Sequence, residues 1–195
     1  LGTSGDDSVV RDAVDYAVEN GVVVIAAAGN CGSSSQGICA NQPAGVVTFP
    51  ASYNKVVAVG ATTAANQRAS FSSYGQRLDI VAPGSGSLWS TTWSAGNQTT
   101  GYKQTLHGTS YASPIVAGAA ALIKSIRPDT TVNDIRALLM ASSQKVAAMS
   151  GSVYTTTYGH GLLDIARSIE VANALNSIEE ATPVLYQSGN YKADK

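Results

Sequence analysis

The apolar positions near the start of the chain first follow a helical period and then become continuous. Between Asp6 and Asn20 the apolar residues recur on one face of a helix, and Gly21 marks its end. Ser4 and Asp6 are candidate caps. The next segment, VVVIAAA (22–28), is apolar throughout and rich in β-branched residues, which is typical of a strand buried on both faces of a parallel sheet.

Two further short apolar runs, KVVAVGA (55–61) and LDIVAPG (78–84), predict strands separated by turn-rich segments. Residues 85–106 alternate Thr, Trp and Tyr and carry a single charge, Lys103. That pattern favours a β-hairpin with a Gly-Asn turn over a helix.

Helical patterns dominate the rest of the chain. One helix is predicted over residues 110–126, ending before Pro128, and another over 131–142 with Thr131 as its N-cap. A third is predicted over 164–176, after the segment YGHG.

Alternating helices and buried strands predict a three-layer α/β/α fold with a mostly parallel sheet and helices on both faces. The 195 residues, 44% of them apolar, suffice for one domain with a substantial core. We expect this domain to span residues 1–178, followed by a polar tail at 179–195.

Charge is sparse and balanced, with 12 Lys and Arg against 13 Asp and Glu. This composition leaves no basic face for a nucleic acid, so we expect none to bind. No apolar run reaches the roughly 18 residues of a membrane span, so we expect no membrane insertion. The chain starts at Leu1 without a Met or a signal peptide, and we therefore expect further sequence upstream.

The two cysteines, Cys31 and Cys39, flank a loop written CGSSSQGIC. A Gly/Ser-rich loop of this length can close as a disulfide, and a surface rich in Ser, Thr and Asn but poor in Lys predicts a secreted protein. Two unpaired thiols are the alternative.

Two polar residues are candidates for chemistry. Ser110 stands at the entry to an apolar helix, where unpaired N–H groups and the helix dipole favour a developing negative charge. Asn30 follows the first buried strand, at the sheet edge where open α/β folds build their sites, and its amide can donate to an oxyanion. The alternatives are an N-cap role for Ser110 and a left-handed turn at Asn30 after Gly29.

The segment GTSYASPIVAG (108–118) resembles the nucleophile motif G-T-S-x-A-x-P-x-V-A-G of the subtilisin-like serine proteases, or subtilases. Other segments resemble the family in the same order along residues 1–176. They are LGTSG, AAAGN, FPASYNKVVAVGA, FSSYG, LDIVAPG and YGHGLLD.

The resemblance implies that Ser110 is the nucleophile of a serine endopeptidase, and that Asn30 and the Ser110 backbone N–H bind the oxyanion. The family's triad runs Asp, His, Ser, so both partners of Ser110 would lie upstream of Leu1. The chain is then the C-terminal part of a catalytic domain, with the N-terminal strands of its sheet missing. We expect it to be inactive without the missing N-terminal half.

The two histidines present do not match the family's base. His107 stands three residues before Ser110, at a variable position of the motif, and His160 lies between glycines. A Ser-Asp-His order with Asp129 or Asp134 and His160 would fit an α/β-hydrolase. That reading lacks the G-x-S-x-G elbow. A pseudoprotease that serves as an interaction module is a further alternative.

By the same resemblance, uncharged residues wall the primary specificity pocket, which implies bulky apolar or broad preference. They are Leu1 and Gly2 on one side, Ala27, Ala28 and Gly29 on the other, and Thr48 near the base. A disulfide after Asn30 would stiffen the pocket rim.

The chemistry itself needs no cofactor, but Asp79 falls where related subtilases bind a structural calcium with main-chain oxygens of residues 51–56. The alternative is that Asp79 braces a neighbouring turn without a metal. The expected partners are polypeptide substrates and the N-terminal half of the domain.

Overall fold

Three parallel strands form the central sheet of the computed structural model, in the order β1, β2, β3. They are β1 (Ile25–Ala27), β2 (Val57–Thr62) and β3 (Ile80–Pro83). Each coincides with a predicted strand but is shorter, and β2 is buried along its whole length. The structure describes residues 2–33, 37–40, 42–94, 96, 99–104 and 107–188.

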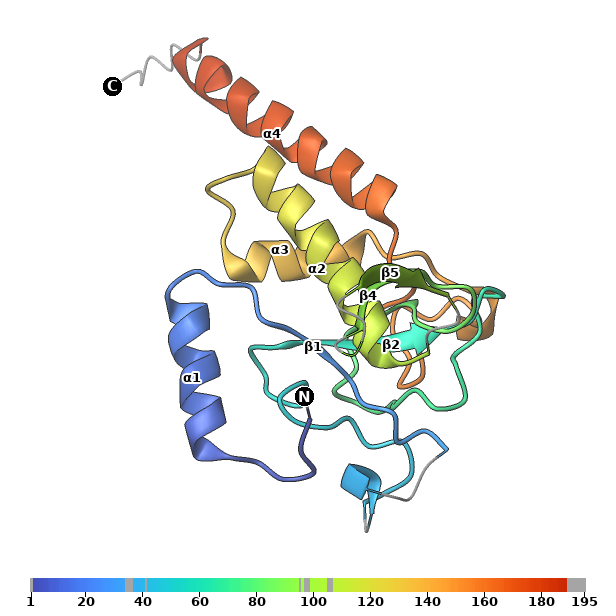
Figure 1. Ribbon diagram of the computed structural model, residues 1–195. Coiled ribbons are helices and arrows are strands. Elements are labelled where there is room, and N and C mark those ends of the chain that lie inside the picture. The colour runs from blue at the N-terminus through green and yellow to red at the C-terminus, as the bar shows by residue number, and fades with distance from the viewer. Residues whose placement is uncertain are drawn as a thin grey trace.

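One face of the sheet is covered by α2 (Thr109–Ile126). Small buried residues of α2, such as Ala112 and Ala119, share a core with Val59 of β2 and Ile80 of β3. Because these helix side chains are short, the helix axis can approach the sheet closely. The outer side of α2 contacts α3 (Val132–Ala141) and α4 (Ile165–Ser188), as Figure 1 shows.

The opposite face is covered in part by α1 (Ser8–Glu19), through a small apolar cluster. That cluster joins Val14 and Val18 of α1 to Val24 and Val56, next to the strands. Helices therefore lie on both faces of a parallel sheet, which confirms the predicted α/β architecture.

The cap of α1 differs from the prediction. Asp7 is the N-cap, and its carboxylate accepts hydrogen bonds from the N–H groups of Val9 and Val10. Ser4 and Asp6 were the wrong candidates because the helix begins at Ser8, and only the residue directly before the first turn can reach its free N–H groups. Thr131 does cap α3, in a capping box with Asp134.

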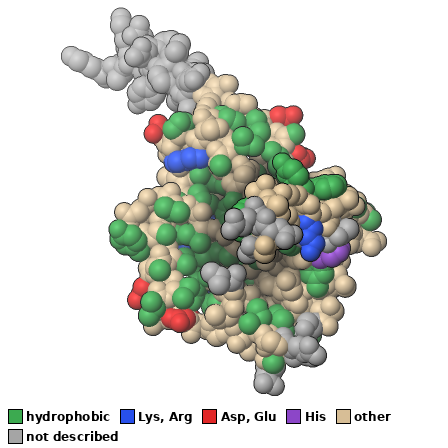
Figure 2. Space-filling view, in the orientation of Figure 1, with side chains coloured by type: hydrophobic (Ala, Val, Ile, Leu, Met, Phe, Trp, Pro, Cys, Tyr) green, Lys and Arg blue, Asp and Glu red, His purple; other side chains and the backbone are tan. Residues whose placement is uncertain are grey.

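The predicted hairpin is present as β4 (Ser90–Ser94) and β5 (Thr99–Lys103), which pair antiparallel. Asn97 of the expected Gly-Asn turn lies outside the described residues. Two short 3₁₀ helices, η1 (Gly37–Cys39) and η2 (Ala147–Met149), complete the elements described. Few charged side chains lie on the face shown in Figure 2, in keeping with the composition.

The last helix is longer than predicted. It was expected to end at residue 176, but α4 continues to Ser188 and so enters the segment predicted as a polar tail. The backbone has no reason to stop at 176, because residues 178–182 (IEEAT) contain neither Gly nor Pro. The helix also continues past Pro183, which the sequence does not predict. The domain boundary at 178 remains a prediction. None of the helices described combines the length and apolar character needed to cross a membrane.

Candidate active site

Ser110 lies in the first turn of α2 with its side chain exposed. The N-cap of this helix is Gly108, so the interpretation of Ser110 as a cap is wrong. The first N–H groups of a helix have no partner within it, and they carry the positive end of its dipole. Ser110 therefore presents both a hydroxyl and a main-chain donor at a site that favours negative charge.

Asn30 is held against the start of α2 by Thr109. The Asn30 Oδ1 atom accepts hydrogen bonds from the Thr109 backbone N–H and the Thr109 hydroxyl, each 3.1 Å long. The Thr109 hydroxyl also accepts a hydrogen bond of 3.2 Å from the Gly29 N–H. Because a backbone N–H requires an acceptor, these contacts identify the oxygen of the amide and leave its NH₂ group on the other side.

Gly108 keeps open the space beside that NH₂ group. A methyl group added at Gly108 would lie 3.7 Å from Asn30 Nδ2 and 3.7 Å from the backbone nitrogen of Ser110. The two donors therefore border one small space. Asn30 is also absent from the non-glycine residues with positive φ among those described, so the left-handed turn at Asn30 is wrong, and it is Gly29 that has a φ of 106°.

The predicted specificity-pocket residues Gly2, Gly29 and Thr48 lie together. A Cβ atom would lie 3.3 Å from the Thr48 hydroxyl oxygen if added at Gly2, and 2.8 Å from it if added at Gly29. Thr48 is buried, and its hydroxyl donates to the Ala28 carbonyl at 3.3 Å. The Thr48 side chain thus lies between the backbones of Gly2 and Gly29, and its role at the base of a specificity pocket stays a prediction.

The other residues predicted for the specificity pocket are Ala27, Ala28 and Leu1. Ala28 is fully buried in the core, so only its backbone can border the pocket, and Ala27 lies at the end of β1. Leu1 lies outside the described residues. The neighbouring segment is positioned by Thr3, which exchanges two backbone hydrogen bonds with Phe49.

Cys31 and Cys39 form a disulfide with an S–S distance of 2.02 Å, which confirms the predicted bond. Both cysteines are buried, and the Cys31 N–H donates to the Ser73 hydroxyl at 3.1 Å. Since Cys31 directly follows Asn30, the bridge ties the turn at residues 37–39 to the segment that carries Asn30.

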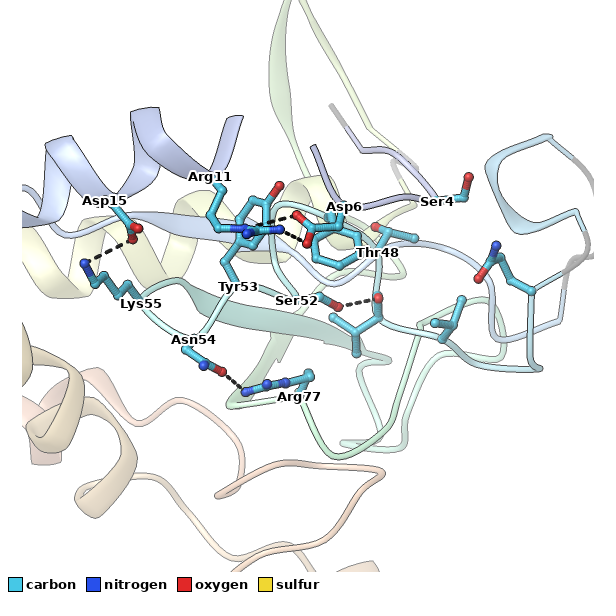
Figure 3. A pocket seen from close by; sticks show the side chains of 14 residues that line it. Ser4, Asp6, Arg11, Asp15, Thr48, Ser52, Tyr53, Asn54, Lys55 and Arg77 are labelled. Carbon is cyan, nitrogen blue, oxygen red and sulfur yellow. Dashed lines mark hydrogen bonds and ion pairs between the residues drawn. The ribbon is translucent and has the colours of Figure 1, made fainter. Parts of the chain in front are cut away.

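A separate cavity of about 710 Å³ lies on the α1 side of Thr48 (Figure 3). Neither Ser110 nor Asn30 lines it. Two of its cations pair with carboxylates: Arg11 with Asp6, and Lys55 with Asp15. Arg77, which also lines the cavity, bonds instead to the neutral amide oxygen of Asn54, so the lining holds one more cation than carboxylates.

Neither histidine is hydrogen-bonded to Ser110 in the part of the chain described. His107 is exposed, and its Nδ1 atom lies 3.2 Å from the Ser85 hydroxyl. The His160 ring packs edge-on against Tyr154, with centroids 5.3 Å apart. Burial, and then the nearby charge of Lys145, lower the pKa of His160.

The α/β-hydrolase arrangement is not assembled either. The Asp134 carboxylate accepts hydrogen bonds from the backbone N–H and the hydroxyl of Thr131 at the start of α3, and Asp129 is exposed in the turn before it. Since Asp134 serves the helix cap and the His160 ring packs against Tyr154, the two do not form an Asp–His pair directed at Ser110.

Comparison with known proteins identifies the family. A model described as the subtilase family, peptidase S8, matches residues 1–161. The chain belongs to the subtilase family. It is 39% identical to subtilisin DY of Bacillus licheniformis over 165 residues, covering 85% of this chain and 53% of that protein. It is 43% identical to alkaline elastase YaB of a Bacillus species over 164 residues, covering 84% and 37%.

Solved structures agree. A structure described as proteases from Pseudoalteromonas arctica superposes with a TM-score of 0.72 at 32% identity, covering 88% of this chain and 49% of that one. This subtilase chain thus spans about half, or less, of the length of the relatives it matches.

The donors around Asp79 do not fit a calcium ion as they are arranged in this subtilase. Asp79 Oδ1 lies 2.9 Å from Nη2 of Arg136, and Oδ2 accepts a 2.9 Å hydrogen bond from the Ala58 N–H. Arg136 also donates to the carbonyl of Asn54, which belongs to the 51–56 loop. The guanidinium therefore already bridges the carboxylate and a main-chain oxygen of the expected ligand set. No group of three acidic, His or Cys side chains suited to a metal occurs within the described ranges.

We therefore expect the melting temperature of the 195-residue chain to be the same in EDTA and in millimolar calcium. Replacing Arg136 by Gln leaves the largely buried Asp79 carboxylate without its counter-ion, and is expected to lower the free energy of unfolding by about 2 kcal/mol. Thermal melts with and without calcium measure both effects. A melting temperature that rises with calcium in the unsubstituted chain would show that the folded chain binds the ion, against this expectation.

Proposed function

We propose that the protein carrying this chain is a serine endopeptidase with Ser110 as its nucleophile. The Ser110 Oγ atom attacks the carbonyl carbon of a peptide bond while its proton passes to a base. The carbonyl oxygen becomes an oxyanion, the C–N bond then breaks, and the amine leaves with that proton. Water hydrolyses the resulting acyl-enzyme by the same route.

The observation that carries this proposal is the placement of Asn30. Thr109 orients the Asn30 amide so that its NH₂ group and the Ser110 N–H border the one space left open by Gly108. Two preorganised donors beside a hydroxyl stabilise the charge that develops on the carbonyl oxygen. No metal or cofactor is needed for this chemistry.

We further propose that the base and its orienting carboxylate come from a part of the protein outside these 195 residues. Two facts support this: neither histidine is hydrogen-bonded to Ser110 among the described residues, and the chain spans about half the length of its relatives. The chain alone is then inactive, and its complement is the remaining part of the catalytic domain.

The proposed substrates are polypeptides whose side chain on the acyl side of the cleaved bond, P1, is uncharged. Gly2, Gly29 and Thr48 support this because no charged group occurs among them. Secretion is also proposed, on the disulfide and the low-charge surface.

Labelling with a fluorophosphonate tests the proposal. An activated serine displaces fluoride and gains one covalent adduct, which intact mass and peptide mapping detect. We expect one adduct, on Ser110, in the full-length protein and none in the 195-residue chain. Labelling of the short chain would show that one of its own histidines is the base. Absence of labelling in both would favour a pseudoprotease.

A further inference from the structure

Ile38 reaches the predicted specificity pocket from a loop that the family motifs do not include. A Cβ atom added at Gly2 would lie 3.5 Å from Cδ1 of Ile38, and 3.3 Å from the Thr48 hydroxyl oxygen. The end of the Ile38 side chain therefore borders the same space as Thr48. Ile38 adds an apolar group at a place where Gly2 and Gly29 have no side chain.

The core does not explain the position of Ile38. Its side chain is 42% exposed and belongs to none of the apolar clusters of the fold. It is held through its neighbour Cys39, which is buried and joined by the disulfide to Cys31. The Ala40 N–H also donates to the Gly37 carbonyl at 3.0 Å, which fixes the turn that presents Ile38.

Cys31 is itself fixed relative to the oxyanion donor. It follows Asn30 in the chain, its carbonyl accepts a hydrogen bond of 3.1 Å from the Gly45 N–H, and its own N–H donates to Ser73. The disulfide therefore holds Ile38, which precedes Cys39, at a fixed place relative to Asn30, which precedes Cys31.

We propose that Ile38 is a specificity-determining residue: it forms an apolar side wall of the P1 pocket, held there by the Cys31–Cys39 disulfide, and selects aliphatic P1 side chains. This inference rests on the proposed function. Packing an aliphatic P1 side chain against Ile38 removes apolar surface of both groups from water, which favours binding. A charged P1 side chain would lose its hydration there without gaining a polar partner, which disfavours binding.

A charge placed at this position tests the wall directly. In the full-length protein, kcat/KM is measured for matched peptides with Leu or Lys at P1, in Ile38→Glu and in its isosteric partner Ile38→Gln. We expect the ratio of kcat/KM for the Lys peptide to kcat/KM for the Leu peptide to be roughly fivefold higher in Ile38→Glu than in Ile38→Gln, because the carboxylate attracts the Lys ammonium group. This difference is expected to shrink at high salt, which screens the attraction. Reducing the disulfide is expected to make the Lys-to-Leu ratios of the two variants more similar, because residue 38 is then no longer held at the pocket.

Leu122→Glu is the matched control, because Leu122 is 44% exposed and lies on α2, away from the pocket. It adds the same charge to the surface without placing it at the rim. If Leu122→Glu shifts the ratio as much as Ile38→Glu does, the effect is general electrostatics and Ile38 is not a wall. If the full-length protein cleaves these peptides but Ile38→Glu and Ile38→Gln have the same Lys-to-Leu ratio, Ile38 does not line the P1 pocket, and the proposed function stands. No cleavage by the unsubstituted full-length protein would overturn both.

Discussion

Replacing Ser110 by Ala in the full-length protein is expected to lower kcat by about 10⁶, the loss known for removing the serine from a subtilisin triad. Ala removes only the Oγ atom, and with it the bond to the acyl group. Its backbone N–H stays at the start of α2, and Ala is a good helix former, so the fold is expected to remain. Peptide binding is therefore retained while turnover is lost.

Hydrolysis of a chromogenic peptide measures this loss, with circular dichroism to check the fold. Ser113→Ala is the control, since it removes the same hydroxyl group from a half-buried serine about one turn further along α2. Residual turnover within tenfold of the unsubstituted protein would mean that another group is the nucleophile.

If Asn30 is the proposed oxyanion donor, replacing it by Asp is expected to lower kcat by about 10²–10³ with a smaller effect on KM, the range known for loss of an oxyanion-hole Asn in subtilisin. Asp keeps an oxygen that can accept from the Thr109 N–H, so the contact that holds the loop is retained. It replaces the NH₂ donor by an oxygen, however, and places negative charge next to the developing oxyanion. The loss therefore falls on the transition state rather than on substrate binding.

Steady-state kinetics measures kcat and KM separately, and thermal melts show whether the contact between residue 30 and Thr109 is kept. Thr109→Val is the structural comparison, because it removes the hydroxyl contacts to Asn30 and Gly29 but leaves the Asn30 amide in the chain. We expect Asn30→Asp to melt close to the unsubstituted protein and Thr109→Val to melt lower. If Asn30→Asp retained full kcat, the amide would not be an oxyanion donor.

Local pattern was sufficient to predict much of this fold. The continuous apolar runs predicted β1, β2 and β3 because a strand covered on both faces can carry apolar residues at every position. Helical spacing predicted α1, α2 and α3, and Thr131 was recognisable as a cap because capping depends on a few adjacent residues. The motif around Ser110 and the position of Asn30 after a buried strand selected the residues that we propose for the site, and the disulfide predicted between the two cysteines is present.

Only the tertiary structure decided how those residues meet. Periodicity shows which side of an element is buried but not which distant segment covers it, so the contact of Asn30 with Thr109, 79 residues apart, could not be derived locally. The ion pair of Arg136 with Asp79 and the approach of the Ile38 side chain to Gly2 also join distant segments, so they could not be derived locally either. Element ends also depended on context, as the continuation of α4 to Ser188 shows. The residue types of the proposed site are thus a property of the sequence, while the orientation of the Asn30 amide and the approach of Ile38 to Gly2 follow from long-range packing.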